Sequence, residues 1–152
     1  GFSKGRSDNS VWMKEVMKVM VVQNPKSRCN DKHIKKGEDT MNKYAIFAFK
    51  GELMCFQHVL LNALDMQSKG IESKVIIEGE AVKLINELEE SENKLYKMAK
   101  DKGLIAAICK ACSAKLGVLE YNQNVGIPMG DEMSGHPAMS TYIEQGYEII
   151  TM

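Results

Sequence analysis

Residues 104–117 read LIAAICKACSAKLG, and the character of the side chains changes in the middle of this stretch. Its first five residues are apolar throughout, which is typical of a buried strand. The residues that follow are small or basic and run to Gly117, which indicates a short helix with a glycine stop. Cys109 and Cys112 therefore lie where a strand passes into a helix, and binding sites form at that edge of open α/β sheets.

This position favours a reactive thiol. A helix amino terminus offers partial positive charge and free N–H groups, and Lys110 adds a full charge, so we expect the pKa of Cys109 to be lowered. Cys112 follows three residues later, close enough to resolve or share a mixed disulfide or persulfide. The competing interpretation is that Cys109 ends a buried strand as an inert small apolar residue.

The rest of the chain alternates strands and helices. The apolar runs predict strands at 44–49, 74–78, 104–108, 126–129 and 147–151. Amphipathic stretches predict helices over 53–69, 81–99, 109–116 and 137–145 between them, and residues 91–93 are a candidate break within the second. This βαβαβαβαβ pattern predicts an α/β three-layer sandwich. We expect a five-stranded parallel sheet in the flavodoxin-like order 2-1-3-4-5, with helices on both faces.

In that order, the loops after the first, third and fourth strands meet at one edge of the sheet. The residues that these loops bring to the predicted pocket are Glu52, Met54, Cys55, His58, Cys109, Cys112, Ser113, Asp131, Ser134 and His136. His136 precedes Pro137, so it either caps the next helix or lies beside the thiols.

Two other classes of function stay open. Cys55-x-x-His58 and Cys109-x-x-Cys112 together supply four ligands suited to a tetrahedral Zn site. An assembly subunit without chemistry of its own is the other alternative. The loop after the first strand has one glycine and an acidic residue, so flavin or nucleotide binding is not expected, and no cofactor is required.

The composition is that of a globular protein. The chain has 152 residues, 44% hydrophobic, and a formal net charge of zero. Residues 41–152 carry eleven Lys/Arg against fifteen Asp/Glu, a net charge of −4, which argues against nucleic acid as a partner. No apolar run reaches the length of about 20 residues that a membrane helix needs. The four cysteines do not resemble a disulfide framework, which favours the reducing cytoplasm.

Residues 1–40 differ from the remainder. They carry nine Lys/Arg against five Asp/Glu, and one apolar island at residues 11–22 predicts a short helix. The sequence KGEDTM at residues 36–41 resembles a translated ribosome-binding site, so we expect Met41 to be the natural start and residues 1–40 a translated leader. The alternative is a native arm. The globular domain then covers 41–152, and Cys29 and His33 receive no functional role.

Residues 41–152 resemble the DsrE/DsrF-like proteins, which include sulfur-relay subunits. The resemblance is carried by Cys109 at the end of its strand with Gly117 eight residues later, and by the strand at 44–49, the helix stop at Gly70 and the closing strand after Gly146. In the family, the cysteine at the position of Cys109 carries a persulfide. The resemblance also implies a homotrimer or hexamer that works with sulfur donor and acceptor proteins.

The sequence departs from the relay subunits at Cys112 and at residues 54–58, both of which are additions, and so resembles a stand-alone cytoplasmic branch. We therefore predict a sulfur-relay or thiol-transfer protein, a sulfurtransferase-like carrier. In this prediction Cys109 attacks the outer sulfur of a donor persulfide, Cys112 resolves or shares that sulfur, and Cys55, His58 and His136 shape the pocket.

Overall fold

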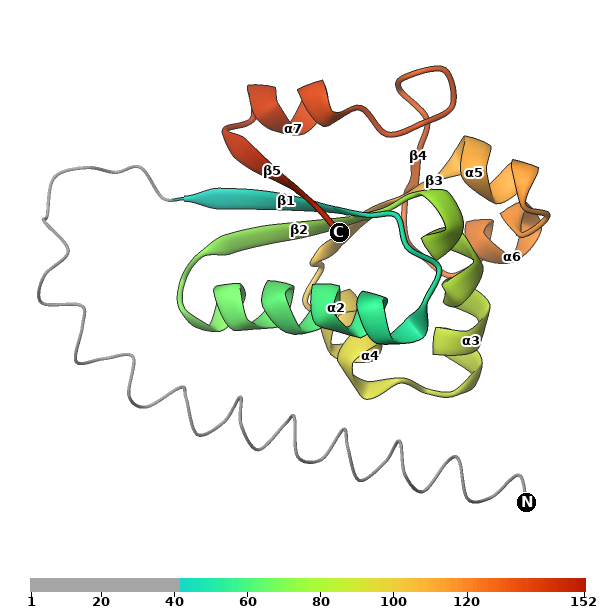
Figure 1. Cartoon of the computed structure of the whole chain (residues 1–152), viewed down its shortest axis with the longest axis horizontal. Helices are drawn as coiled ribbons and strands as arrows, with labels where there is room; N and C mark the ends of the chain where they lie inside the picture. Colours follow the sequence, from blue (N-terminus) through green and yellow to red (C-terminus); the bar gives the residue numbers. More distant parts are fainter. Residues whose placement is uncertain (1–41) are drawn as a thin grey trace, which may run out of the picture. The chain divides into compact units, whose positions relative to one another are not determined.

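The computed structural model describes residues 42–152, and these form a parallel sheet with helices packed on it (Figure 1). The expectations for residues 1–40, namely the leader, the short helix and the absence of a role for Cys29 and His33, lie outside the described residues. The strands are β1 (Lys43–Ala48), β2 (Glu72–Ile77), β3 (Ile105–Cys109), β4 (Met129–Gly130) and β5 (Tyr147–Thr151). The helices are α2 (Leu53–Ser68), the 3₁₀ helix η3 (Gly79–Lys83), α3 (Leu84–Glu90), α4 (Lys94–Asp101), α5 (Lys110–Lys115), α6 (Leu119–Gln123) and α7 (Met139–Glu144).

The five strands form one sheet in which every neighbouring pair is parallel. The predicted α/β class, the five parallel strands and the helices on both faces are confirmed (Figure 1). The order of the strands is 4-3-2-1-5, whereas the sequence led us to expect 2-1-3-4-5. In the observed order, β2 separates β1 from β3.

The packing of two helices explains this order. Helices α2 and α4 pack against each other, so they cover the same face of the sheet. With right-handed crossovers, helices on one face require β1, β2 and β3 to follow one another in a single direction. The chain then returns from β4 to the far side of β1, and α7 covers the opposite face (Figure 1). The apolar stripe of a helix shows that it packs on the sheet but not which face it covers, so this order was not predictable from periodicity.

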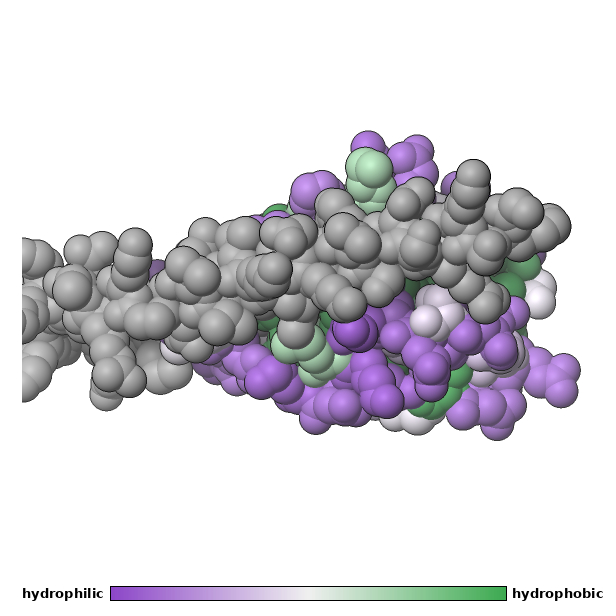
Figure 2. All heavy atoms as spheres, turned by 90° about the horizontal axis from the view of Figure 1, so that it is seen from below, coloured by the Kyte–Doolittle hydropathy of each residue, from purple (hydrophilic) through white to green (hydrophobic). Residues whose placement is uncertain are grey.

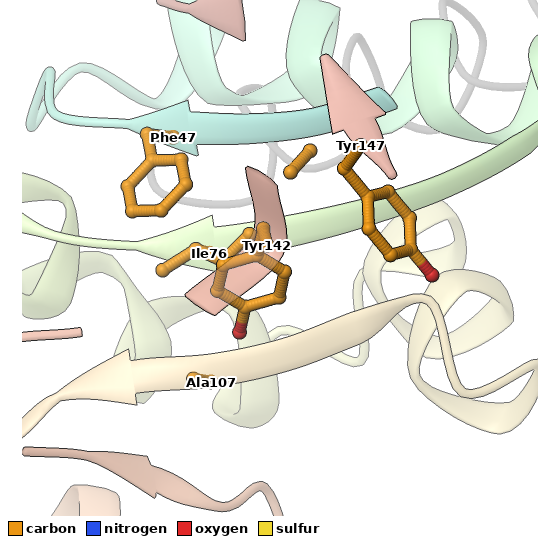
Figure 3. Close-up of a cluster of buried hydrophobic side chains, with 6 residues drawn as sticks. Phe47, Ile76, Ala107, Tyr142 and Tyr147 are labelled. Atoms are coloured by element: carbon orange, nitrogen blue, oxygen red, sulfur yellow. The ribbon is translucent and has the colours of Figure 1, made fainter. Parts of the chain in front are cut away.

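The core beneath α7 is built from alternate residues of the central strands. Ala45 and Phe47 of β1, together with Ile76 of β2, are fully buried there. The ring of Tyr142 meets the ring of Phe47 edge-on at 5.7 Å (Figure 3). The ring of Tyr147 packs edge-on against the ring of Tyr142, with the ring centroids 6.0 Å apart. Aromatic pairs in this geometry stabilise a core by about 0.5–1.5 kcal/mol beyond their burial.

The opposite face of the sheet is covered by the longer helices. Phe56, Leu60 and Leu64 recur along α2 and are buried against β1 and β2. Hydrophilic side chains dominate the part of this side that is visible in Figure 2. Within residues 42–152, no helix combines the length and the apolarity needed to cross a membrane.

The candidate break at residues 91–93 is present. The helical stretch over 81–99 is interrupted there, because Asn93 caps α4 by accepting a hydrogen bond from Tyr96 N at 3.0 Å. Helix α7 begins after Pro137 rather than at it, with Ala138 as the N-cap residue. Ile143 of α7 is 57% exposed.

Candidate functional site

Cys109 is the last residue of β3 and the N-cap residue of α5. Its Sγ accepts a hydrogen bond from the backbone N–H of Cys112 at 3.3 Å. This is the capping arrangement in which a side chain satisfies one of the free N–H groups of a helix start. The C-x-x-C spacing predicts that Cys109 and Cys112 lie side by side, and this hydrogen bond from the Cys112 backbone to the Cys109 sulfur holds them there.

The loop after β4 places His136 over this junction. The backbone N–H of Ala111 donates to the carbonyl oxygen of Gly135 at 2.8 Å, which ties the loop to α5. Gly135 has a φ of +89°, a conformation that favours glycine. A Cβ at this position would lie 3.1 Å from the Cβ of Ala111, so the close approach of loop and helix also depends on glycine. Met133 and His136 form an isolated antiparallel bridge within this loop.

Cys109, Cys112 and His136 form a compact cluster. His136 Nδ1 lies 3.1 Å from Cys109 Sγ and 3.7 Å from Cys112 Sγ. The three atoms all lie within 4.8 Å of one another. Cys109 is fully buried, whereas Cys112 and His136 are half-buried, so the cluster has an inner sulfur and an outer sulfur.

The pKa of Cys109 is raised to about 12, first by burial and further by Cys112 and Glu78. The hydrogen bond from the Cys112 amide lowers this pKa, but by less than burial raises it. The prediction of a lowered pKa is therefore wrong. The expected amide is present beside the sulfur, but the removal of water outweighs it, because desolvation disfavours a charged thiolate.

Glu78 is a member of the surroundings that the sequence analysis missed. It follows β2 directly, and its side chain is buried. Burial raises the pKa of the Glu78 carboxyl, and the neighbouring His136 lowers it. Glu78 was missed because the predicted order put β2 at an edge, whereas in the structure β2 is the neighbour of β3. The strongest signal for it is an acidic residue directly after the apolar run at residues 75–77.

The loop after β1 is not part of the cluster. In the described residues, the group that could hold a metal contains neither Cys55 nor His58. Both line a separate open cavity of about 530 Å³, together with Phe49, Lys50, Thr151 and Met152. Neighbouring strands are about 4.8 Å apart, and β2 lies between β1 and β3, so the two loops do not share one site.

The remaining residues of the first loop lie on the surface. Met54 is 72% exposed. Glu52 is exposed, and the thiol of Cys55 points to its carboxylate, with Sγ and Oε2 3.7 Å apart.

Of the remaining predicted residues, Ser113 is buried, whereas Asp131 and Ser134 lie on the surface. Ser113 is buried, and its hydroxyl donates to the carbonyl oxygen of Cys109 at 2.7 Å, so it holds the backbone and does not face the sulfurs. Asp131 is exposed and pairs with Lys110 at 3.7 Å, which draws the lysine charge toward solvent. Ser134 is exposed with a φ of 51° at the tip of the loop.

The arrangement combines two thiols with one imidazole. An imidazole nitrogen within hydrogen-bond reach of a thiol can accept its proton as the sulfur attacks. Two thiols at this separation can exchange a sulfur atom or form a disulfide. The same three atoms are also soft ligands for a thiophilic cation. The chemistry available at this edge of the sheet is therefore thiol chemistry or metal binding.

Comparisons with known proteins agree with this geometry. The model of the DsrE/DsrF-like family matches residues 43–152. An uncharacterized protein of Methanocaldococcus jannaschii, MJ0733, is 31% identical over 98 residues, which are 62% of this chain and 78% of that protein. No solved structure matches the chain. The match over residues 43–152 spans every strand and helix described above, and the chain belongs to the DsrE/DsrF-like family.

Proposed function

We propose that this chain carries a sulfane sulfur atom as a persulfide on Cys109, and that Cys112 shares this sulfur with donor and acceptor molecules. Membership of the DsrE/DsrF-like family supports sulfur relay in general. The observation that carries the proposal is the cluster of Cys109 Sγ, Cys112 Sγ and His136 Nδ1 within 4.8 Å. It puts two exchanging sulfurs and a proton acceptor in contact.

Sulfur enters through Cys112, which is the more exposed thiol. Its sulfur attacks the outer sulfur of a donor persulfide, R–S–SH. A new S–S bond forms while the S–S bond of the donor breaks, and the donor leaves as a thiolate with the bonding electron pair. The proton of Cys112 passes to His136 Nδ1, 3.7 Å away, and then to the leaving thiolate. The transferred sulfur keeps its oxidation state, so no external oxidant or reductant is needed.

Cys109 then attacks the outer sulfur of the Cys112 persulfide. Its proton passes through His136 Nδ1, 3.1 Å from Cys109 Sγ, to the departing sulfur of Cys112. The sulfane sulfur now lies on the buried thiol, where external thiols do not reach it. Delivery to an acceptor thiol reverses these steps. If Cys112 instead attacks the inner sulfur, a Cys109–Cys112 disulfide forms and hydrosulfide is released, which is the resolving reaction.

This route differs from direct attack by Cys109 on the donor. Cys109 is fully buried, and burial raises the pKa of its thiol to about 12. The half-buried Cys112 is therefore the better first acceptor, because the reactivity of a thiol depends on its accessibility to the donor. Only the first acceptor changes in this route. Cys109 is still the residue that carries the persulfide, as the family resemblance implies.

The test measures intact mass in a background that lacks the other two cysteines, Cys29→Ser/Cys55→Ser. The reduced protein is treated with one equivalent of a small persulfide donor in the presence of a metal chelator and then desalted. We expect the background variant to retain one sulfur atom per chain after brief exposure to a small thiol, because the sulfur rests on the buried Cys109. The further change Cys109→Ser leaves the sulfur on the more exposed Cys112, and it should then be lost to that thiol. Cys112→Ser is expected to slow loading. Retention of sulfur by the Cys109→Ser variant at the background level contradicts the carrier role, and unchanged loading by Cys112→Ser contradicts the entry route.

The proposal extends to partners and location. It includes protein donors and acceptors of sulfur and a homotrimer or hexamer, as the family resemblance implies. It also places the chain in the cytoplasm, where free thiols persist. Light scattering on the purified full chain tests the assembly: a molar mass of three or six chains supports it, and the mass of a single chain contradicts it.

A further inference from the structure

We propose that Cys109, Cys112 and His136 bind one thiophilic divalent cation of the Zn²⁺ class. This ligand set differs from the Cys55, His58, Cys109, Cys112 set expected from sequence spacing, because His136 replaces both residues of the first loop. The inference goes beyond sulfur carriage and does not depend on it. It rests on the placement of the three side chains.

The distances between the ligand atoms are close to those of a tetrahedral site. Zn–S bonds of about 2.3 Å and Zn–N bonds of about 2.0–2.1 Å put sulfur and nitrogen ligands about 3.5 Å apart. His136 Nδ1 lies 3.1 Å from Cys109 Sγ and 3.7 Å from Cys112 Sγ. The two sulfurs and the nitrogen all lie within 4.8 Å of one another. A cation therefore needs only small side-chain adjustments to contact all three atoms.

The backbone holds these ligands before any cation arrives. Cys109 and Cys112 belong to one helix start and are joined by the bond from Cys112 N–H to Cys109 Sγ. The loop that bears His136 is tied to the same helix through Ala111 N–H and the carbonyl of Gly135. A site in which ligands are fixed by such contacts loses little freedom on binding, which favours affinity.

Charge at the site also favours a cation. Two thiolates, the neutral imidazole and a divalent cation together carry no net charge. The buried carboxylate of Glu78 lies near enough to act electrostatically on both Cys109 and His136. Lys110, the nearest basic residue in sequence, pairs instead with Asp131 at 3.7 Å. The cluster thus has an acidic side chain nearby, and the charge of Lys110 is paired with another residue.

Three protein ligands leave a fourth position for water or an external thiolate, as in open Zn sites. Cys109 closes the inner side of the cluster, and the half-buried Cys112 and His136 leave the fourth position toward solvent. A bound cation occupies both sulfurs, so metal binding and sulfur loading compete for the same atoms. Cation binding therefore blocks sulfur loading, and this one consequence rests on the function proposed above.

The test titrates Co²⁺ into the reduced, metal-free full chain in the Cys29→Ser/Cys55→Ser background. Thiolate-to-cobalt charge-transfer absorption reports the sulfur ligands, and displacement by Zn²⁺ gives its affinity. We expect one cation per chain. Loss of an outer-sphere partner alone costs about 10–100-fold in affinity. His136→Ala and Cys112→Ser are therefore each expected to weaken binding by roughly 100-fold or more.

His58→Ala is the matched control, because His58 lies in the separate cavity, and it should leave affinity unchanged. Circular dichroism checks that each variant is folded, and the half-buried positions of His136 and Cys112 make their replacement tolerable. Absence of the charge-transfer band in the background variant overturns the inference, as does wild-type affinity in His136→Ala. Sulfur loading is measured with chelator present, so its outcome and that of the metal titration are independent.

Discussion

The Cys109 sulfur accepts a hydrogen bond from the Cys112 amide and still has a pKa raised to about 12 by burial. The sequence identified the amide, because the change from strand to helix is visible in the pattern of side chains. It did not indicate how deeply the sulfur lies, because depth depends on residues far away in the chain. Gly135 and His136, which lie over Cys109, are 26 and 27 positions later.

His136 is expected to speed sulfur transfer by accepting the thiol proton. His136→Ala should lower the rate of transfer from the loaded chain to a small thiol by roughly 10²-fold, the lower end of general-base contributions. Stopped-flow detection of the product persulfide measures this rate. His58→Ala serves as the control, because His58 is exposed in a different cavity. Equal rates in His136→Ala and wild type would remove His136 from the mechanism.

The two thiols of the cluster should differ in their reaction with an alkylating agent. Cys112 is half-buried and Cys109 is fully buried, so native protein treated with iodoacetamide should be labelled at Cys112 first. Tryptic digestion after Lys110 puts the two residues on separate peptides, and their labelling can be followed by mass spectrometry. In urea-unfolded protein the difference should shrink. Faster labelling of Cys109 in the native protein would contradict the assignment of inner and outer sulfurs.

Among the elements, the β4–α7 loop matters most because it brings His136 to the thiols. Gly135→Ala forces a side chain into left-handed backbone at φ +89° and puts its Cβ 3.1 Å from Ala111. The left-handed conformation alone costs about 1–2 kcal/mol. We expect the Gly135→Ala variant to lose this amount of unfolding free energy in urea and to transfer sulfur more slowly.

Gly70→Ala provides the matched control for that variant. Gly70 has a φ of +78°, but nothing lies within 4 Å of a Cβ placed there. The Gly70→Ala variant should therefore lose a similar amount of free energy of unfolding and leave sulfur transfer unchanged. If both variants transfer sulfur at the wild-type rate, the approach of the loop to α5 does not control the site.

Helices α5 and α6 are joined to η3 by one buried amide. Asn122 Nδ2 donates to the carbonyl of Val82 and to the hydroxyl of Ser113, both at 3.0 Å. Asn122→Ala leaves these buried acceptors without a donor and should destabilise the fold by about 1–3 kcal/mol in urea unfolding. Asn124→Ala, which removes an exposed bond to Glu120, should cost much less. Equal losses would show that the buried amide has no special role.

The elements themselves were largely predictable. The apolar runs located all five strands, and the β3–α5 junction at Cys109 came from the change of pattern within residues 104–117. The position of His136 beside the thiols was one of two expectations for it, and the structure has Ala138 in the alternative capping role. Glu78, Cys55 and His58 were misjudged together, because all three depend on which strands are neighbours.

At the scale of the whole molecule, the order of strands decides which loops share a site. Placing β2 between β1 and β3 moves Glu78 toward the thiols and moves Cys55 and His58 away from them. Strand order follows from helices that pack on one face of the sheet, and no local pattern records this. The fold class could therefore be predicted, whereas the composition of the site could be predicted only in part.

Global stability should fall at alkaline pH because of Tyr142 in the core beneath α7. Burial raises the pKa of Tyr142 from 10.0 to about 12. The folded state then holds a proton that the unfolded state releases, so stability is fully present below pH 10 and declines between about pH 10 and 12. Urea unfolding across this range measures the decline. Tyr142→Phe should make it shallower, without abolishing it because burial also raises the pKa of Tyr96. An identical decline in Tyr142→Phe would contradict this account.

The most direct test of sulfur carriage is to identify which cysteine of the unmodified chain holds the retained sulfur. The reduced, chelator-treated protein is given one equivalent of persulfide donor, unfolded directly in excess alkylating agent so that thiols and persulfides are capped before sulfur migrates, and digested with trypsin. Cleavage after Lys110 separates the peptide of Cys109 from that of Cys112, and Cys29 and Cys55 fall on others. The account predicts that the retained sulfur is found mainly on the Cys109 peptide. Sulfur spread equally over the four cysteine peptides, or concentrated on Cys55, would contradict it.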